Sequence, residues 1–183
     1  MSFSEIAAVG RNRELGKKGG LVFDIPSDLQ FFKKITLGKP VFMGLNTLKS
    51  LPKKLPGRKH YVLARTREEV LEAARDKGFS MIVSVKEPLE VETDDILYFV
   101  DDLEEFIEKW EDSEDEMFVI GGGMVYAEML SHVEKLYLTE VDGEDDKAEV
   151  FFPEFDKSKF NREIIGKGAD HDLTYTHVLY TRK

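Results

Sequence analysis

Short apolar stretches alternate along this chain with segments whose apolar residues recur every three or four positions. The short stretches are rich in valine, isoleucine, leucine and aromatic residues, which is typical of β-strands. The longer spacing predicts amphipathic helices. The predicted strands are residues 3–9, 40–43, 59–64, 81–83, 96–100, 117–120 and 135–141. The predicted helices are residues 26–35, 45–50, 66–77, 102–110 and 124–132.

Alternation of strands and helices predicts an α/β fold with a central, mostly parallel sheet flanked by helices. Near the C-terminus, residues 162–165 and 174–180 are predicted strands joined by a polar loop at 166–172. Such a hairpin would add antiparallel edge strands to the sheet. The 183 residues contain no internal repeat or low-complexity linker, so we expect one domain over residues 1–183.

Two predicted loops stand out from the rest of the chain. Residues 10–24 contain Gly16, Gly19 and Gly20, and a loop of this length in a compact domain is usually functional or mobile. Residues 51–58 form a proline- and glycine-containing turn with three basic side chains.

Net charge and composition exclude several classes of function. A formal charge of −10 disfavours general binding to nucleic acid or to an anionic membrane. We expect the acidic runs 111–116 and 142–146 to be solvated loops without metal. The four histidines form no cluster, which favours packing or surface roles. The absence of cysteine excludes disulfides and suits the cytoplasm, and no apolar run approaches the ~20 residues of a membrane span.

Asp28 is the most informative single residue. With Pro26 at the first helical position, Asp28 shares one helix face with Phe31, Phe32 and Ile35, and it is the only ionisable residue on that face. A half-buried carboxylate beside aromatic rings suits a cationic, planar heteroaromatic ligand. An acidic residue in the first turn also favours the helix dipole, so both interpretations remain open on this helix alone.

Two junctions between a strand and a helix carry glycines. In residues 118–126 three glycines follow the strand, and in residues 41–47 Gly44 precedes Asn46 and Thr47. Glycine permits close approach of a ligand, and the helix start offers N–H groups to a phosphate, although a tight turn would look similar. Arg65 ends a third strand, after Ala64, where it could hold another phosphate. The combination favours NADPH over NADH.

The order of these motifs resembles the dihydrofolate reductase family in its chromosomal bacterial form. The resemblance runs from Ile6 to the end of the chain and implies a three-layer α/β fold of that family. The matching segments are residues 6–9, 25–33, 39–44, 55–58, 119–123, 136–139 and 151–153.

The resemblance implies reduction of 7,8-dihydrofolate to 5,6,7,8-tetrahydrofolate, with NADPH as cofactor, in a monomer that also binds antifolates. Asp28 would bind the 2-amino group and N3 of the pterin, supported by Thr139. Arg58 would hold the α-carboxylate of the glutamate tail, with Lys33 and Lys53 nearby. The implied pocket is lined by Ile6, Ala7, Leu29, Phe32, Leu51 and Leu55.

The resemblance also implies the surroundings of NADPH and of the reacting atoms. Leu21 would gate the water that protonates N5, and Phe23 would form an aromatic wall. The family has a cis bond between paired glycines, expected here between Gly122 and Gly123. The implied cofactor contacts are Ala8, Leu15, Gly16, Leu21, Gly44, Leu45, Asn46, Thr47, Ala64, Arg65, Gly121, Gly122, Gly123, Met124, Val125 and Tyr126.

The sequence departs from the family pattern at several positions. Val22-Phe23 replaces a proline–tryptophan pair, which removes an indole N–H donor and predicts altered trimethoprim binding. Leu45 replaces an arginine near the cofactor phosphates, so Arg65 would carry more of the preference for NADPH. Residues 148–150 replace a Gly-Asp-Thr sequence, and residues 66–95 are longer than in compact members.

Two other functions are alternatives to the reduction of dihydrofolate. A pyrimidine or pteridine reductase of the same fold would keep the three glycines but would not need Asp28, Phe32, Thr139 and Arg58 together. A folate-binding protein without turnover is the second alternative, and retention of Asp28 argues against it. Turnover of dihydrofolate distinguishes the three.

Overall fold

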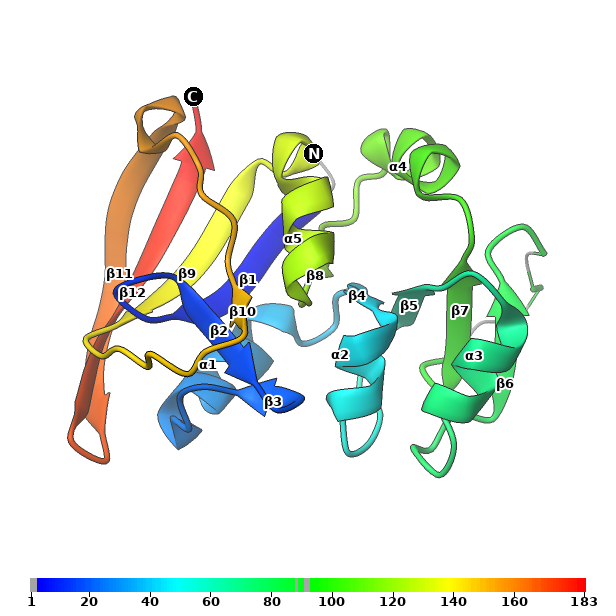
Figure 1. The fold of residues 1–183 in the computed structure, drawn as a ribbon. Coiled ribbons are helices and arrows are strands. Elements are labelled where there is room, and N and C mark those ends of the chain that lie inside the picture. Colours follow the sequence, from blue (N-terminus) through cyan, green and yellow to red (C-terminus); the bar gives the residue numbers. More distant parts are fainter. Residues whose placement is uncertain (1–2, 88, 91–92) are drawn as a thin grey trace.

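A nine-stranded mixed sheet, with helices on both faces, organises the molecule (Figure 1). The computed structural model describes residues 3–87, 89–90 and 93–183. Within the sheet the strand order is β11-β12-β9-β1-β8-β4-β5-β7-β6. All pairs between β9 and β6 are parallel, and β12 and β11 add two antiparallel pairings at one edge. The predicted α/β class and mixed sheet are therefore confirmed.

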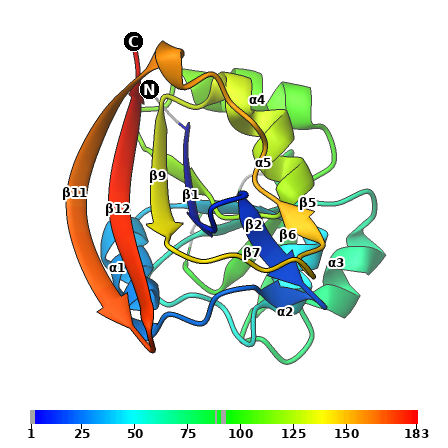
Figure 2. The same cartoon turned by 60° about the vertical axis from the view of Figure 1, so that its left-hand side comes forward.

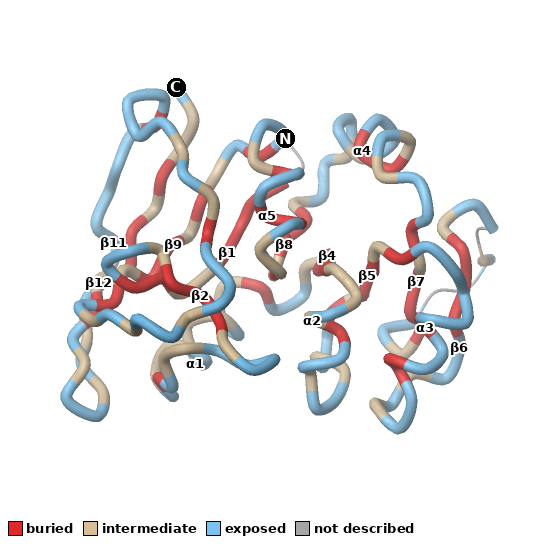
Figure 3. Tube along the Cα trace, in the orientation of Figure 1, coloured by how far each residue is buried: buried red, intermediate tan, exposed pale blue. Residues whose placement is uncertain are grey.

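The strands of this sheet lie close to the predicted ranges, except that β11 and β12 are longer than predicted. They are β1 (Phe3–Val9), β4 (Val41–Gly44), β5 (His60–Leu63), β6 (Met81–Ser84), β7 (Ile96–Val100), β8 (Met117–Val119), β9 (Lys135–Val141), β11 (Phe160–Asp170) and β12 (Leu173–Arg182). Their side chains supply most of the buried residues, so the buried segments of Figure 3 follow the central strands.

Over the described residues, the chain forms α-helices α1 to α5, which flank the sheet (Figure 2), and two short 3-10 helices. The first three pack on one face and the next two on the other. They are α1 (Pro26–Thr36), α2 (Leu45–Ser50), α3 (Arg67–Ala73), α4 (Leu103–Glu111), α5 (Gly123–Met129), η1 (Leu130–His132) and η2 (Lys157–Lys159). None of the helices in the described ranges is long and apolar enough to cross a bilayer.

Two predicted helices end earlier than expected. The helix predicted over residues 66–77 ends at Ala73, because Asp76 and Gly78 have φ angles of 59° and 94°, outside the right-handed helical region. The helix predicted over residues 124–132 changes to 3-10 geometry after Met129.

The prediction of a fifteen-residue loop at residues 10–24 was wrong. This segment contains β2 (Glu14–Lys17) and β3 (Gly20–Leu21), which form a small sheet with β10 (Val150–Phe151). Lys18 and Gly19 form the turn, with φ angles of 51° and 75°. Positive φ at both central residues matches the twist of a two-residue hairpin. The glycine-rich sequence resembles a loop, so the hairpin was not predicted.

The predicted polar loop at residues 166–172 was also wrong, because β11 and β12 continue through it. Their hairpin closes at His171 and Asp172, with φ angles of 46° and 67°. An irregularity between Ile164 and Gly166 bends β11 along its length. Lys, Gly, Ala and Asp are poor strand formers, so local propensity did not reveal the pairing.

The expectation that both acidic runs are only solvated loops was wrong, because each run contacts another segment of the chain. The side chain of Glu116 is 13% exposed, and its carboxylate accepts hydrogen bonds from Lys39 Nζ (2.7 Å) and Ser4 Oγ (2.6 Å). In the second run, Asp142 pairs with Arg11, and Asp145 pairs with Lys17. Each run therefore fastens one segment of the chain to another.

Glu5 is a carboxyl group in the core, on the strand at the centre of the sheet. Its residue is fully buried, and neither carboxylate oxygen has a hydrogen-bond partner among the described residues. Burial raises the pKa of Glu5 well above its ordinary value, and the charge of Arg182 opposes this rise. The guanidinium of Arg182 itself donates to the carbonyls of Val133 and Leu130. Glu5 is therefore destabilising when it is charged.

Replacing Glu5 with methionine should raise the free energy of unfolding by about 1–3 kcal/mol near pH 8. The gain should shrink near pH 5, because Glu5 has a higher pKa in the folded chain than in the unfolded chain. Wild-type stability from this group is complete below the unfolded pKa and is lost as pH rises through the folded pKa. Urea unfolding at both pH values measures the difference.

Glu163→Met is the matched control, because Glu163 is exposed on β11. This variant should show no such gain at either pH. An equal effect of Glu5→Met near pH 5 and pH 8 would contradict an ionising, buried carboxyl group.

Candidate functional site

Four parallel strands bring their carboxyl ends to one edge of the sheet. The neighbours β1, β8, β4 and β5 run in the same direction, so the residues that follow them meet there. Gly44 N donates a hydrogen bond to Gly121 O at 2.8 Å, which joins the two glycine junctions. The carboxyl edge of a parallel sheet is where α/β proteins commonly bind ligands.

The glycines at this edge bring two backbones unusually close together. A Cβ on Gly44 would lie 2.9 Å from Val125 Cγ2, and a Cβ on Gly121 would lie 2.9 Å from Thr47 Oγ1. Gly121 also has a φ of 133°, which disfavours any other residue. No side chain among the described residues caps α2 or α5, so their first N–H groups remain available. The backbone here forms a cradle suited to a phosphate.

The cis peptide bond lies one residue earlier than the resemblance implied. It joins Gly121 to Gly122, rather than Gly122 to Gly123. Gly122 is the N-cap of α5 and Gly123 is already helical, so the bond between them belongs to the start of the helix. The irregular backbone is confined to the residue before the cap.

Asp28 does not cap its own helix. Ile25 is the N-cap residue of α1, and no side chain in the described ranges accepts a hydrogen bond at that position. The carboxylate turns instead to the sheet, where Asp28 Oδ1 accepts a hydrogen bond from Thr139 Oγ1 at 2.5 Å. Asp28 also remains in the first turn of α1, where its charge favours the helix dipole, so the structure is compatible with both interpretations.

The surroundings of Asp28 pull its ionisation in two directions. Its side chain is 17% exposed, and this burial raises the pKa of Asp28 above its ordinary value. The Thr139 hydrogen bond and the nearby His177 lower the same pKa. A carboxylate with few solvent contacts and a fixed donor is pre-oriented for a partner that carries N–H groups.

His177 is the site residue that sequence reasoning missed. Its Nδ1 atom lies 2.8 Å from Thr139 Oγ1 and 3.8 Å from Asp28 Oδ1. Its ring stacks on Phe31, with centroids 3.7 Å apart and an angle of 13° between the planes. The predicted surface or packing role of His177 therefore omits its polar contact with Thr139. The alternating pattern of β12 placed His177 on one face but could not show which residues oppose it.

Most of the predicted apolar pocket residues share one side of the sheet. Ile6 is buried in the cluster beneath α1 and α2, and Phe32, Leu51 and Leu55 pack against it. Leu29 is 54% exposed, although it lies next to Asp28 on α1. Ala7 packs against the cluster on the opposite face. The geometry thus gathers the aromatic and aliphatic wall around the carboxylate and leaves Leu29 at its rim.

Arg58 is buried at the amino end of β5. Its Nη1 donates to Thr36 Oγ1 at 3.0 Å and its Nε donates to Pro56 O at 3.1 Å. Burial lowers the pKa of Arg58, but a guanidinium remains charged in a protein. Its Cζ lies 6.0 Å from the Phe32 ring centroid, which places a positive charge beside the pocket wall. Lys33 and Lys53 are exposed.

The segment around β2 and β3 is held by the chain between β9 and β10. Glu14 is buried, and its carboxylate accepts from Asn12 N (2.6 Å) and Asp145 N (2.7 Å). Glu149 N donates to Gly16 O, and Lys18 N donates to the Glu149 carboxylate, both at 2.9 Å. These hydrogen bonds therefore join two segments that are distant in the sequence at this edge.

Leu21 and Phe23 have different surroundings. Leu21, at the end of β3, is 65% exposed. Phe23 packs against the cluster of Ile25, Val141 and Tyr175. A Cβ on Gly143 would lie 3.0 Å from Phe23 Cε1, so the ring rests directly on that backbone.

The predicted cofactor residues divide into buried and exposed groups. Leu15, Ala64, Val125 and Tyr126 are buried, and Tyr126 OH donates to Ile6 O at 2.7 Å. They support the edge from beneath. Gly16 and Gly121 are buried as well. Exposed or partly exposed at the edge are Ala8, Gly44, Leu45, Asn46, Thr47, Arg65, Gly122, Gly123 and Met124.

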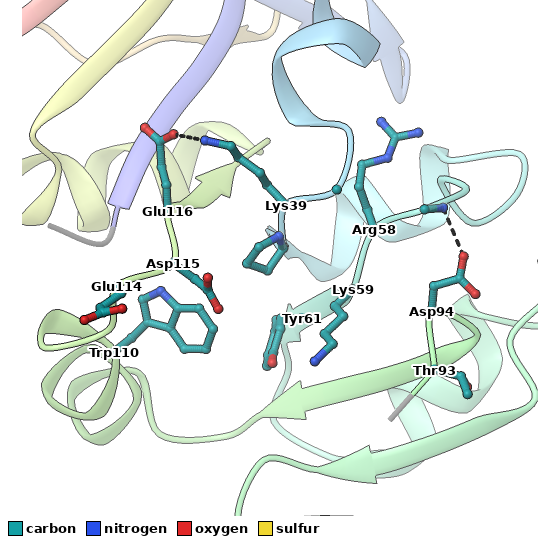
Figure 4. A pocket seen from close by; sticks show the side chains of 13 residues that line it. Lys39, Arg58, Lys59, Tyr61, Thr93, Asp94, Trp110, Glu114, Asp115 and Glu116 are labelled. Atoms are coloured by element: carbon teal, nitrogen blue, oxygen red, sulfur yellow. Dashed lines mark hydrogen bonds and ion pairs between the residues drawn. The ribbon is translucent and has the colours of Figure 1, made fainter. Parts of the chain in front are cut away.

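A separate cavity of about 650 Å³ opens at the amino edge of the same strands (Figure 4). It is lined by Trp110, Tyr61 and charged side chains, including the Lys39–Glu116 ion pair. The guanidinium of Arg58 points away from it, toward Thr36. Among the described residues there is no group of three His, Cys, Asp or Glu side chains that could hold a metal ion.

The fold and the site together are those of an α/β protein with a glycine cradle beside a half-buried carboxylate. A family model described as dihydrofolate reductase matches residues 2–182, and the chain belongs to that family. It is 31% identical to a dihydrofolate reductase of Haemophilus influenzae, with 100% of each chain covered. It is 28% identical to that of Bacillus subtilis, covering 98% of this chain and 94% of the relative.

A solved structure also shares the fold. This is the dihydrofolate reductase from Enterococcus faecalis complexed with NADP(H) and RAB-propyl, with a TM-score of 0.75 and 21% identity. The match covers 100% of this chain and 96% of the other.

Replacing Gly44 with alanine should destabilise the protein by about 1–3 kcal/mol, because the new methyl group would overlap Val125 Cγ2. Val125→Ala removes the atom that clashes. In the double variant the cost of Gly44→Ala should therefore fall well below its cost alone. Urea unfolding of the four proteins measures this coupling. Strictly additive effects would show that the two residues do not limit each other.

Proposed function

We propose that this protein reduces 7,8-dihydrofolate to 5,6,7,8-tetrahydrofolate with NADPH, by hydride transfer to C6 and protonation of N5. Membership of the dihydrofolate reductase family supports the reaction. The observation that carries the proposal is the 2.5 Å hydrogen bond between Thr139 and Asp28, at the base of an apolar wall. A carboxylate held by a fixed donor beside aromatic rings suits the N–H groups of a pterin.

Asp28 binds the pterin in this proposal. Its two oxygens accept from the 2-amino group and N3, a bidentate arrangement that fixes the plane of the ring. Thr139 adds a contact to the 2-amino group. Ile6, Ala7, Leu29, Phe32, Leu51 and Leu55 exclude water from the ring system and its aminobenzoyl group, and this lowers the dielectric around the ion pair.

Arg58 binds the α-carboxylate of the glutamate tail. Its hydrogen bonds to Thr36 and Pro56 hold the guanidinium in place and leave donors for a carboxylate. Lys33 and Lys53 are exposed and add positive charge near the tail. Asp28 at the pterin end and Arg58 at the glutamate end together fix the position of the substrate along the pocket.

The glycine cradle fits a dinucleotide. Backbone N–H groups in the first turns of α2 and α5 would hold the phosphates, because side chains at Gly44 and Gly121 would block close approach. The N–H groups of Gly44 and Tyr126 are already donated to Gly121 O and Gly122 O. Arg65 would hold the 2′-phosphate, supported by its exposed position directly after Ala64 at the end of β5. Ala8, Leu15, Gly16 and Leu21 would face the nicotinamide end. When bound, NADPH supplies the hydride.

The proton for N5 reaches the site through water in this proposal. Asp28 raises the basicity of the bound pterin, and it acts as an orienting anion rather than as the direct donor. Leu21 controls entry of water, consistent with its exposed position at the end of β3. Phe23 anchors that segment through its packing on Gly143.

We also propose that the protein acts as a monomer in the cytoplasm. Every residue given a role here comes from one chain, so a partner is not required to complete the site. A sequence without cysteine suits a reducing compartment. Antifolates would occupy the same pocket as dihydrofolate.

Asp28→Asn should lower kcat/KM for dihydrofolate by about 10²–10⁴-fold near pH 7, because the amide cannot provide the anion that orients and polarises the pterin. Oxidation of NADPH, followed with and without dihydrofolate, measures this. Asp24→Asn is the matched control. Asp24 is exposed four residues earlier, and its variant should retain wild-type kcat/KM.

Absence of turnover in the wild type, together with tight binding of NADPH and folate, would indicate a silent member of the family. Binding of NADPH without folate would point to a reductase for another heterocycle. Equal rates in the wild type and Asp28→Asn would remove Asp28 from the mechanism.

Arg65→Ala should reduce the preference for NADPH over NADH by about 10–100-fold, the value of charge-assisted hydrogen bonds to a phosphate. The ratio of kcat/KM for the two cofactors measures the effect. Arg75→Ala removes the same charge from an exposed arginine that pairs with Glu72, and it should leave the ratio unchanged. Equal losses with NADPH and NADH would mean that Arg65 does not read the 2′-phosphate.

A further inference from the structure

Three polar side chains from three elements form a line at the base of the pocket. Thr139 on β9 lies directly opposite His177 on β12 in the antiparallel register. Thr139 Oγ1 is 2.5 Å from Asp28 Oδ1 on α1 and 2.8 Å from His177 Nδ1. Thr139 therefore stands between the carboxylate and the imidazole.

A count of protons fixes the direction of this line. Ionised Asp28 can only accept hydrogen bonds, and the Thr139 hydroxyl has one proton to donate. When that proton is directed to Asp28, Thr139 can meet His177 only as an acceptor. His177 Nδ1 must then carry a proton.

The imidazole is uncharged when it does this. Burial lowers the pKa of His177 below its ordinary value, and Asp28 only partly opposes that effect. A neutral imidazole carries a single proton, so the one on Nδ1 leaves Nε2 bare.

We propose that His177 is a positioning residue, which donates from Nδ1 to Thr139 so that the Thr139 hydroxyl points permanently at ionised Asp28. The chain His177→Thr139→Asp28 delivers a donor to the carboxylate without placing a second charge in the pocket. This deepens the proposed function and, for its catalytic consequence, rests on it. The orientation of the three groups does not depend on turnover.

Among its neighbours, the imidazole of His177 has its main polar connection in the hydrogen-bonded series His177–Thr139–Asp28. Phe31 covers one side of the ring by stacking. Tyr175, on the same strand, lies 5.0 Å away between centroids, and its hydroxyl bonds to Ser27 Oγ. On β11 the opposing residue is Gly166, which offers no side chain.

Two further titratable groups belong to this region. Tyr126 from α5 feels the charges of Asp28 and Glu5, and burial raises its pKa well above the ordinary value. Its hydroxyl is engaged with Ile6 O. Asp28 is thus the carboxylate that His177 faces directly.

The direction of the effect follows from these contacts. Burial raises the pKa of Asp28, and the Thr139 hydrogen bond lowers it. The Coulombic effect of His177 on this pKa requires a protonated imidazole, so neutral His177 acts on Asp28 through Thr139 alone. Fixing the hydroxyl toward the carboxylate removes the alternative in which Thr139 donates to the imidazole and Asp28 loses its donor. His177 accordingly widens the pH range over which Asp28 is ionised and ready for a pterin.

Histidine tautomers can be read directly from ¹⁵N NMR of the labelled protein. Wild-type His177 should be the neutral Nδ1–H form near pH 7.5, whereas free histidine favours Nε2–H. Thr139→Val removes the acceptor and should abolish this preference. An Nε2–H tautomer in the wild type would overturn the proposal, whether or not the protein turns over dihydrofolate.

Two variants of His177 separate donation from packing. His177→Phe keeps a ring to stack on Phe31 but removes the donor. His177→Asn removes the ring and places an amide donor close to the position of Nδ1. We expect the ¹³C-detected titration of the Asp28 carboxyl to move to higher pH in His177→Phe and to stay near wild type in His177→Asn.

A purely structural role for His177 predicts the reverse order, with the larger disturbance in His177→Asn. That result would overturn the proposal. Urea unfolding of both variants confirms that each is folded before titration. Turnover assays of the wild type report separately on the proposed function, because a silent protein with an Nδ1–H tautomer would retain the positioning chain and lose only the reaction.

Discussion

Parallel pairing of β1 with both β8 and β9 is the constraint on which the rest of the structure depends. It aligns the carboxyl ends of β1, β8 and β9, and the parallel pairing of β4 with β8 in the same sheet brings Gly44 to Gly121. The same register places Ala8 beside Thr139, and β12 then places His177 on the other side of Thr139. The cradle and the carboxylate pocket are therefore two results of one set of backbone hydrogen bonds.

Glu5 and Asp28 show how the surroundings of a carboxyl group determine the consequence of its charge. Glu5 has no hydrogen-bond partner within the described ranges, and it burdens the core when charged. Asp28 has a donor in Thr139 and an opening to solvent, so its charge remains usable. Desolvation of a carboxylate that has no hydrogen-bond partner opposes folding. Desolvation of a carboxylate that has such a partner leaves a charge oriented for a ligand.

The sequence was sufficient for the fold class and most of the element boundaries, because periodicity and composition report local structure. It was insufficient wherever partners were distant. His177 lies on an ordinary alternating strand, and only the β9–β12 register reveals that it opposes Thr139. The hairpin at Lys18-Gly19 was missed because glycines and lysines resemble a loop until β10 supplies the pairing. The cis bond was placed one residue late, since the sequence Gly-Gly-Gly contains no marker of the helix cap.

The attachment of β2 to the segment after β9 has a consequence for how freely the sequence can diverge. Arg11 N, Glu149 N and Asp145 N all donate from the backbone, and Gly143 O and Gly16 O accept from it. Such contacts recognise the path of the chain and are indifferent to most side chains. Side chains also take part, because Glu14 and Glu149 accept backbone hydrogen bonds and Asp142 and Asp145 form ion pairs with Arg11 and Lys17. Residues of this segment that make none of these contacts can therefore differ between related chains while the segment stays attached, provided that the close-packed Gly143 remains.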